Sequence, residues 1–187
     1  DQGAAYVYKV QDESFVLEQK LLPSDPAAGV NFGAALTIDG NTIIVGAPKD
    51  SQLGSGAGAA YVFTFNGLSW SQQAKLNAPD GAAGDNFGSS VAVSGDRALI
   101  GAPNDDLVGT GFNYSSVGSA YFFARTGGSW SLSLKATYSS GSPNDLMGAA
   151  VAIDGDTALI GMPGYDVNIQ NLNENRGAFL TYRWSGS

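Results

Sequence analysis

Oxygen-bearing side chains are densest at three consecutive residues near the middle of the chain, Asn104, Asp105 and Asp106. Carboxylate and amide oxygens are the ligands of hard cations such as Ca²⁺, and a group of acidic side chains can also recognise a basic partner. Asp and Asn are equally frequent in turns, where their side chains bond the backbone. The sequence therefore leaves two interpretations open: a cation or recognition site, with Asp105 and Asp106 as the metal candidates, and ordinary turn formation.

Aromatic side chains lie in the same polar stretch and in a later one. Phe112 and Tyr114 follow the acidic cluster, and Tyr165 stands beside Asp166. In exposed loops, aromatic rings stack on sugars or anchor protein partners, although they also fold back onto their own loops. The candidate ligand-binding residues are therefore Asn104, Asp105, Asp106, Phe112, Tyr114, Tyr165 and Asp166.

The composition excludes several kinds of chemistry. The 187 residues include no Cys and no His, which removes disulfides, thiolate metal sites and imidazole bases. A net charge of −8 argues against binding to nucleic acid and to anionic membrane surfaces, which select basic proteins. No apolar run reaches the ~18–20 residues of a membrane-spanning helix, so we expect no membrane insertion. Because the chain has no phosphate-binding loop and no nucleophile elbow, we expect no catalytic residue and no enzyme.

A repeated sequence motif indicates which structural elements position these residues. One copy reads Asn31-Phe32-Gly33 … Gly46-Ala47-Pro48, and the next reads Asn86-Phe87-Gly88 … Gly101-Ala102-Pro103. A third, more divergent copy keeps Gly148, Gly161 and Pro163. Gly33 and Gly88 are 55 residues apart, and Gly88 and Gly148 are 60 apart. Internal repeats of this length are typical of propellers and solenoids.

Each copy predicts four antiparallel strands. In the first copy these are residues 33–38, 42–45, 60–65 and 70–75, with turn signals such as Asp39-Gly40 between them. The second strand is apolar on both faces, as a buried strand should be, whereas the fourth is polar enough for an outer edge. Aromatic residues that recur at the repeat spacing are predicted to pack in the interior, among them Tyr6, Tyr61 and Tyr121.

The Phe-Gly and Gly-Ala-Pro motifs resemble FG-GAP repeats, the blade unit of the integrin α-subunit β-propeller and of many bacterial secreted proteins. The resemblance covers nearly the whole chain. Members of this family often carry a calcium site between the first two strands of a blade. Here the Asp39-Gly40 turn and its equivalents leave no room for the oxygen ligands that Ca²⁺ takes. We therefore expect no cofactor, because these loops do not support calcium.

The predicted fold is all-β: a β-propeller of four-stranded antiparallel blades, with about three and a quarter blades in this chain. Because propellers typically close with four to eight blades, we expect the propeller to be partial, and to belong to a longer one or to be completed by other chains. Phe32 and Phe87 are predicted to wedge between blades, beside glycines that allow close backbone approach. Residues 1–187 form one partial propeller: a half blade at 1–21, blades at 22–76 and 77–136, and a blade lacking its last strand at 137–187.

In an up-and-down blade, alternate loops emerge on opposite faces, so the long loops share one face, which we call the long-loop face. Our leading hypothesis is an extracellular or cell-surface binding or adhesion module, without enzyme activity, that binds a protein or glycan on this face. One alternative is a structural subunit of a surface filament or layer that self-associates through its unfinished blades. The other is an accessory domain of a secreted hydrolase. The carboxylates expected on this face are Asp25, Asp50, Asp80, Asp85, Asp105, Asp106, Asp145 and Asp166.

Overall fold

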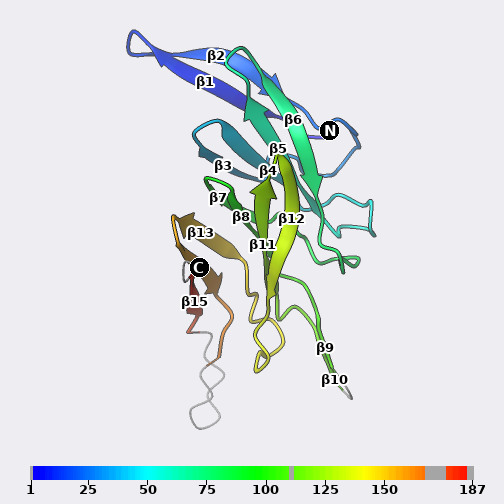
Figure 1. The fold of residues 1–187 in the computed structure, drawn as a ribbon. Coiled ribbons are helices and arrows are strands. Elements are labelled where there is room, and N and C mark those ends of the chain that lie inside the picture. Colours follow the sequence, from blue (N-terminus) through cyan, green and yellow to red (C-terminus); the bar gives the residue numbers. More distant parts are fainter. Residues whose placement is uncertain (1, 110–111, 167–175, 185–187) are drawn as a thin grey trace.

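The computed structural model describes residues 2–109, 112–166 and 176–184, with the backbone alone at residues 109 and 112. All regular structure in these residues is β-strand. Four antiparallel sheets follow one another in chain order, and a short hairpin projects from the third (Figure 1). The predicted all-β fold of repeated antiparallel blades is therefore confirmed. In the described part of the chain, no helix is long and apolar enough to cross a membrane.

We name the sheets blades A to D, and each holds consecutive strands of the chain. Blade A contains β1 (Ala5–Gln11) and β2 (Ser14–Leu21). Blade B contains β3 (Ala35–Asp39), β4 (Thr42–Ala47), β5 (Ala59–Phe65) and β6 (Trp70–Leu76). Blade C contains β7 (Ser90–Ser94), β8 (Arg97–Ala102), β11 (Ser119–Thr126) and β12 (Ser129–Ala136), and its projecting hairpin contains β9 (Leu107–Gly109) and β10 (Phe112–Tyr114). Blade D contains β13 (Ala150–Asp154), β14 (Thr157–Met162) and β15 (Ala178–Arg183).

The strands of each blade run up and down in the order of the chain. In blade B, β4 pairs with β3 and β5, and β6 pairs with the other edge of β5. Blade C repeats this order with β7, β8, β11 and β12. β4 is buried along its whole length because it is apolar on both faces and lies inside the sheet. The strands of blade B begin and end within about two residues of their predicted positions, as is usual for boundaries.

Tight turns gather on one face of the molecule and long connections on the other. β3 and β4 are joined by Gly40 and Asn41, and Gly40 has a φ of 51°, which favours glycine. The corresponding turns of blades C and D place glycines in the same conformation. The connections from β4 to β5 and from β8 to β11 lie on the opposite face, together with the segments that join one blade to the next (Figure 1). This second face is the long-loop face.

The Phe-Gly and Gly-Ala-Pro motifs meet where one blade packs on the next. The Phe32 ring is buried against Tyr61 in a T-shaped arrangement, with ring centroids 5.4 Å apart. The second copy of the motif repeats this geometry at 5.3 Å. The backbone carbonyl of Gly88 occupies the space that a Cβ atom on Gly46 would need. Phenylalanine therefore fills the space between blades, and glycine lets the backbones of neighbouring blades touch.

Buried apolar side chains form three clusters, one at each contact between neighbouring blades. Leu21 belongs to the cluster between blades A and B, Ile44 to that between B and C, and Phe122 to that between C and D. Blade A is covered on one face only. Tyr6 is 51% exposed, whereas Tyr61 at the same position of blade B is 0% exposed. The prediction that Tyr6 packs in the interior is wrong, because in the described residues no blade covers its face.

Candidate functional site

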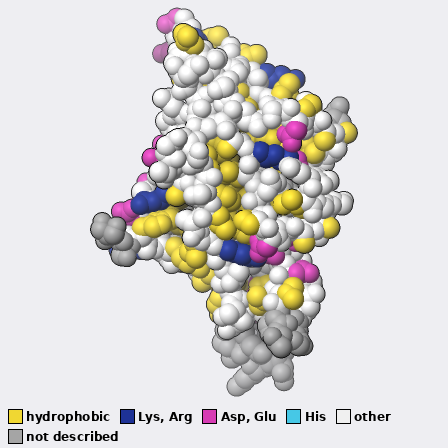
Figure 2. Space-filling view, turned by 45° about the vertical axis from the view of Figure 1, so that its right-hand side comes forward, with side chains coloured by type: hydrophobic (Ala, Val, Ile, Leu, Met, Phe, Trp, Pro, Cys, Tyr) yellow, Lys and Arg dark blue, Asp and Glu magenta, His cyan; other side chains and the backbone are white. Residues whose placement is uncertain are grey.

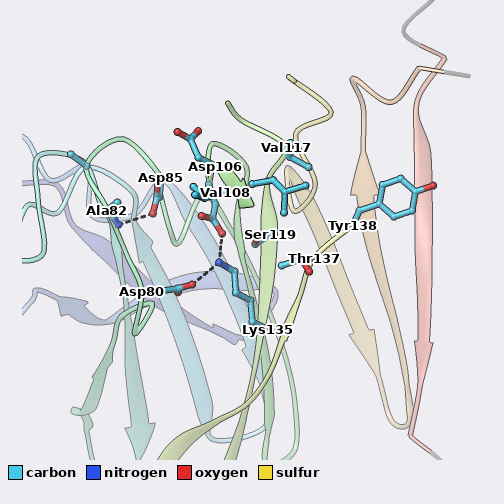
Figure 3. A pocket seen from close by; sticks show the side chains of 14 residues that line it. Asp80, Ala82, Asp85, Asp106, Val108, Val117, Ser119, Lys135, Thr137 and Tyr138 are labelled. Carbon is cyan, nitrogen blue, oxygen red and sulfur yellow. Dashed lines mark hydrogen bonds and ion pairs between the residues drawn. The ribbon is translucent and has the colours of Figure 1, made fainter. Parts of the chain in front are cut away.

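A pocket of about 490 Å³ opens on the long-loop face beside blade C (Figure 3). Four parts of the chain build its wall: the segment between blades B and C, the loop after β8, the ends of β11 and β12, and the start of the segment between blades C and D. We call it the acidic pocket, because Asp80, Asp85, Asp105 and Asp106 line it together with a single basic residue, Lys135.

Lys135 binds two of these carboxylates. Its Nζ atom lies 2.6 Å from Asp80 Oδ2 and 2.6 Å from Asp105 Oδ2. The Tyr121 hydroxyl lies 3.0 Å from Asp80 and 3.2 Å from Asp105, and the ammonium group sits 5.2 Å from the centre of the Tyr121 ring. Tyr121 and Lys135 are directly paired across β11 and β12, so the register of the sheet fixes this pair. The two aspartates then reach it from loops.

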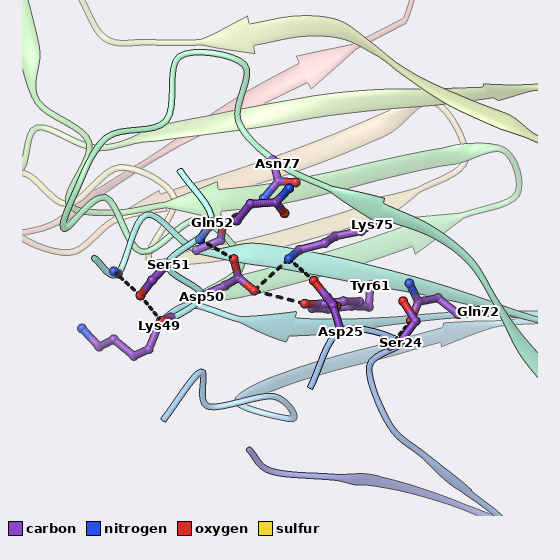
Figure 4. Close-up of polar contacts among 12 residues, drawn as sticks. Ser24, Asp25, Lys49, Asp50, Ser51, Gln52, Tyr61, Gln72, Lys75 and Asn77 are labelled. Atoms are coloured by element: carbon purple, nitrogen blue, oxygen red, sulfur yellow. Dashed lines mark hydrogen bonds and ion pairs between the residues drawn. The ribbon is translucent and has the colours of Figure 1, made fainter. Parts of the chain in front are cut away.

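Blade B carries the same cluster (Figure 4). Lys75 Nζ lies 2.6 Å from Asp25 Oδ2 and 2.9 Å from Asp50 Oδ2, and the Tyr61 hydroxyl donates to Asp50 at 3.1 Å. Tyr61 and Lys75 are again directly paired across two strands. Because the arrangement recurs at equivalent positions, it indicates a structural role for Asp105, which joins the loop after β8 to its blade as Asp50 does after β4.

The surroundings of this cluster fix its protonation near neutral pH. Burial raises the pKa of Asp80, but hydrogen bonding to Lys135 and its charge outweigh burial and hold the pKa below its usual value. Burial lowers the pKa of Lys135, but hydrogen bonds to the two carboxylates and their charges raise it overall. Burial, then the neighbouring carboxylates, raise the pKa of the Tyr121 hydroxyl, which therefore stays protonated. The cluster is a charged ammonium group between two carboxylates.

The other two carboxylates of the acidic pocket differ in exposure. Asp85 is 4% exposed and accepts a hydrogen bond of 2.7 Å from the Ala82 N–H. Its pKa is raised, first by burial and then by the charges of Asp105 and Asp106. Asp106 is exposed and accepts a hydrogen bond of 2.9 Å from the Ser116 N–H. Burial is thus the main cause of the raised pKa of Asp85, and the negative charges of Asp105 and Asp106 add to it.

The acidic pocket suits a positively charged group on an apolar stem. Four carboxylates outnumber one ammonium group on its polar wall, and Leu107, Val108 and Val117 form an apolar wall. Lys and Arg side chains combine a charged head with an aliphatic stem of this kind. On the side of the molecule shown in Figure 2, basic side chains lie beside acidic ones, in keeping with the ion pairs described above.

The repeat is matched by a known family. A family model for the FG-GAP repeat matches residues 15–63 and 70–123, which together make up more than half of the chain. The chain belongs to the FG-GAP repeat family. The matched segments run from β2 through blade B and into β11 of blade C, so they cover the two complete copies of the FG-GAP motif. Among curated proteins, none matches the chain.

The FG-GAP turns of this chain do not fit calcium. Asp39 Oδ2 accepts a hydrogen bond of 2.6 Å from the Gly95 N–H in the next blade, and Ser94 Oγ accepts one of 3.1 Å from the Gly155 N–H one blade further. Each turn is therefore bonded to its neighbour instead of forming a ring of oxygen ligands. In the described ranges, no group of three or more acidic side chains is placed to hold a metal ion, and Asp105 is already paired with Lys135.

Three candidate residues from the β8–β11 connection have different environments. The Asn104 backbone N–H donates to the Asp85 carbonyl at 3.3 Å, so Asn104 helps to hold the loop in place beside the acidic pocket. Tyr114 lies on β10, away from the pocket lining, and is 41% exposed. The side chain of Phe112 lies outside the described residues.

Two further candidates belong to blade D. Tyr165 occupies the position that Asp105 has in blade C, and its ring packs on Tyr138 with centroids 5.7 Å apart. This candidate therefore folds back onto the segment between blades C and D. Asp166 is close enough to the buried Asp145 to raise its pKa, after burial itself. Neither side chain lines the acidic pocket.

The lysines of the clusters were missed by sequence reasoning. Lys20, Lys75 and Lys135 are 55 and 60 residues apart, which is the spacing of the motif glycines. The chain has only nine Lys and Arg residues, so this recurrence is informative. Each lysine lies over the tyrosine paired with it, at 5.6, 5.2 and 5.2 Å from the ring centre. A search for charged residues at the repeat spacing would have found the cluster.

Proposed function

We propose that this chain is an extracellular or cell-surface binding module, without enzyme activity, that takes a basic side chain of a protein partner into the acidic pocket. FG-GAP repeats occur in integrin-like adhesion proteins and in other extracellular proteins, which supports this class of function. The observation that carries the proposal is the excess of carboxylates in a pocket on the long-loop face. Long loops on a rigid scaffold are the usual place for binding.

The exposed carboxylates determine how a partner would enter. Asp106 is exposed and the Asp80 side chain is 53% exposed, so both can meet an incoming ammonium or guanidinium group. Val108 is 71% exposed at the rim and offers an apolar surface to the stem of that side chain. A charge-assisted hydrogen bond of this kind contributes about 1.5–3 kcal/mol. The negative field of the pocket would also speed the approach of a basic partner at low salt.

A glycan is the second kind of partner that the sequence suggested for this face. Of the aromatic rings that the sequence suggested for sugar stacking, Tyr165 is packed against Tyr138, and Tyr114 lies on the projecting hairpin outside the acidic pocket. Tyr138 lines the pocket, but its ring is packed against Tyr165. Charge and shape together therefore favour a basic protein segment. The proposed binding uses side chains of the chain itself and requires no cofactor.

Binding of short peptides tests the proposal. The probes are Arg-rich and Lys-rich peptides, matched peptides with Gln in place of the basic residues, and a set of neutral glycans. We expect the basic peptides to bind, and the affinity to fall at least about tenfold between 50 mM and 500 mM salt because exposed charges are screened. Asp106→Asn keeps an acceptor for the Ser116 N–H and should weaken binding several-fold. Asp154→Asn, an exposed acid at the tight-turn face, is the matched control.

Equal effects of Asp106→Asn and Asp154→Asn would show that the peptides respond to overall charge alone, and would overturn the proposal. Binding of a neutral glycan in preference to every basic peptide would assign the face to sugars. Turnover of a hydrolase substrate that Asp106→Asn abolishes would instead make the chain an enzyme.

A further inference from the structure

The acidic pocket has one wall that the repeat itself does not supply. Gly101 and Gly118 are 17 residues apart, whereas Gly46 and Gly58, at the same positions of blade B, are 12 apart. The longer connection of blade C contains the β9–β10 hairpin, which projects away from the sheets (Figure 1). Residues 48–58 of blade B, all of them described, contain no strand. The hairpin is therefore an addition to the blade, and its β9 strand lines the pocket.

The pocket follows the edge of β9 and not one face of the hairpin. Leu107 and Val108 both line it, whereas their partners on β10, Tyr114 and Asn113, do not. Successive side chains of a strand point to opposite faces. A cavity that touches two consecutive residues of one strand, and neither of their cross-strand partners, therefore lies beside that strand in the plane of the hairpin. Val108 stands at this wall of the pocket in Figure 3.

The edge of β9 that borders the pocket presents backbone hydrogen-bonding groups. In the described part of the chain, β9 pairs with β10 alone. Along an antiparallel pair, residues that bond the partner strand alternate with residues whose N–H and C=O groups point away from it. Leu107 and Val108 are consecutive, so one of them directs both groups to the pocket edge. Such an edge can accept a further strand.

Charge determines which kind of strand fits this edge. Asp106 directly precedes β9, is exposed and lines the pocket, so a carboxylate stands at the end of the open edge. An added strand would lie about 4.8 Å from β9, inside the pocket of about 490 Å³. A Lys or Arg at the end of that strand nearest Asp106 would meet its carboxylate. Val108, which is 71% exposed, would be covered by an uncharged neighbour.

We propose, building on the function proposed above, that the partner binds as an extended segment that adds a third strand to the edge of β9 and places its basic residue at Asp106. The partner is then a β-forming segment with a Lys or Arg among uncharged residues. A basic helix is not this partner, because its backbone N–H groups are already bonded within the helix. Backbone bonds to β9 supply affinity for any extended chain, and the carboxylates select the one that carries a positive charge.

Methylation of the peptide backbone separates strand addition from binding through the side chain alone. The probe is the peptide Thr-Val-Thr-Arg-Thr-Val-Thr with both ends blocked, measured on the 187-residue chain. Two variants carry two N-methyl groups each, one at the third and fifth residues and the other at the second and sixth. In an extended chain these two sets face opposite edges. We expect one variant to lose at least about tenfold in affinity, because its donors face β9, and the other to lose less than about twofold.

Hydrogen exchange locates the added strand on the protein. At a free concentration of ten times Kd, the unmethylated peptide should slow exchange of one of the two amides, Leu107 or Val108, by about tenfold, because that amide exchanges only while the peptide is absent. The Leu68 amide, which is bonded in the exposed turn between β5 and β6, should not change. Asp106→Asn should weaken the unmethylated and methylated peptides by the same factor, because charge and backbone act at separate contacts.

The outcomes distinguish this inference from the function on which it rests. Equal affinity of the two methylated peptides, or a bound peptide that protects neither amide of β9, overturns strand addition and leaves the basic-residue site in place. Binding of the Arg-rich peptides without binding of the extended peptide does the same. If no basic peptide binds, or if Asp106→Asn leaves binding unchanged, the proposed function and strand addition both fail.

Discussion

Replacing Gly101 by Ala should destabilise the protein, whereas the same replacement at Gly161 should not. Both glycines stand in the Gly-x-Pro triplet of their FG-GAP copies, Gly-Ala-Pro in one and Gly-Met-Pro in the other. A Cβ atom on Gly101 would overlap the Gly148 carbonyl oxygen of blade D and the Ser90 Oγ. A Cβ atom on Gly161 would meet only Ala150, at the ordinary contact distance of 3.5 Å. The two substitutions are therefore chemically identical, and they differ only in whether the backbone of a neighbouring blade lies where the new methyl group would be.

The size of the effect follows from what would have to move. The Gly148 carbonyl belongs to backbone whose N–H donates to the Gly161 carbonyl at 3.0 Å, so it cannot rotate away as a flexible side chain could. Overpacking of this kind costs about 1–3 kcal/mol, and a clash with backbone belongs at the upper end. Alanine gains about 0.5–1 kcal/mol over glycine inside a strand, because the unfolded chain is less free. We therefore expect Gly101→Ala to lose about 2 kcal/mol, and Gly161→Ala to change by less than about 1 kcal/mol or to gain stability.

Urea and thermal unfolding of the two variants measure the difference. For a chain of this size, 2 kcal/mol corresponds to a fall of about 4–8 °C in the thermal midpoint. Gly46→Ala is a second test of the same reasoning, because its Cβ would overlap the Gly88 carbonyl of blade C. Blades of a repeat protein can unfold separately, so hydrogen exchange should show where the loss occurs, at the contact between blades C and D for Gly101→Ala.

Equal destabilisation by Gly101→Ala and Gly161→Ala would refute this reasoning. It would mean that the strand itself requires glycine, and that close approach between blades does not explain the motif. Unchanged stability in Gly101→Ala would show that the blades can separate by the width of a methyl group without loss.

Other substitutions test the charged groups. Lys135→Met leaves Asp105 without its cation and should lower the free energy of unfolding by about 2–3 kcal/mol. This is less than the loss expected for a fully buried pair, because the pocket is open to water. Lys20 is exposed, so the control Lys20→Met should cost under about 0.5 kcal/mol in urea unfolding. The pKa of Asp80 is lowered in the fold, so its contribution to stability is present above about pH 4 and is lost as pH falls through the folded pKa. The stability difference between the unmodified chain and Lys135→Met should therefore shrink in acid. A stability difference that does not change with pH would contradict this. Asp145 is 1% exposed, and its Oδ1 has no hydrogen-bond partner in the described residues. Burial raises its pKa, so the fold loses stability as pH rises from the unfolded pKa of about 3.9 to the higher folded value. Asp145→Asn should therefore gain about 1 kcal/mol at pH 7 and nothing at pH 3. A loss at pH 7 would show that the carboxylate is stabilised by a contact that the amide cannot make.

Local sequence patterns were sufficient to predict the strands. A run such as Thr42 to Ala47, apolar on both faces and preceded by a glycine turn, is stable only inside a sheet, and β4 is found there. The spacing of the motif glycines gave the register of the repeat, so strand order and the two kinds of loop followed from it. The strands and turns themselves depend on residues within about ten positions of one another, which is the range that turn chemistry and alternation control.

The charged clusters could not be predicted in this way. Asp25, Asp50 and Lys75 are 25 residues apart from one to the next, and they meet because the blade folds back on itself three times. In the sequence, Asp50 and Asp105 looked like turn formers or ligands, and the structure pairs each with a lysine of the fourth strand. Their partners are set by the register between strands and by the path of the loops, neither of which a local pattern encodes.

The sequence by itself determined that this chain forms FG-GAP blades, which strands each blade contains, and which loops share a face. Tertiary structure alone decided which of these similar positions are covered. Tyr6 and Tyr61 occupy the same place in the repeat, yet one is half exposed and the other is buried. Gly101 and Gly161 differ in the same way in the space around them. The physical reason is that a blade buries its faces against its neighbours, so identical residues acquire different environments, and different roles, from the blade that lies beside them.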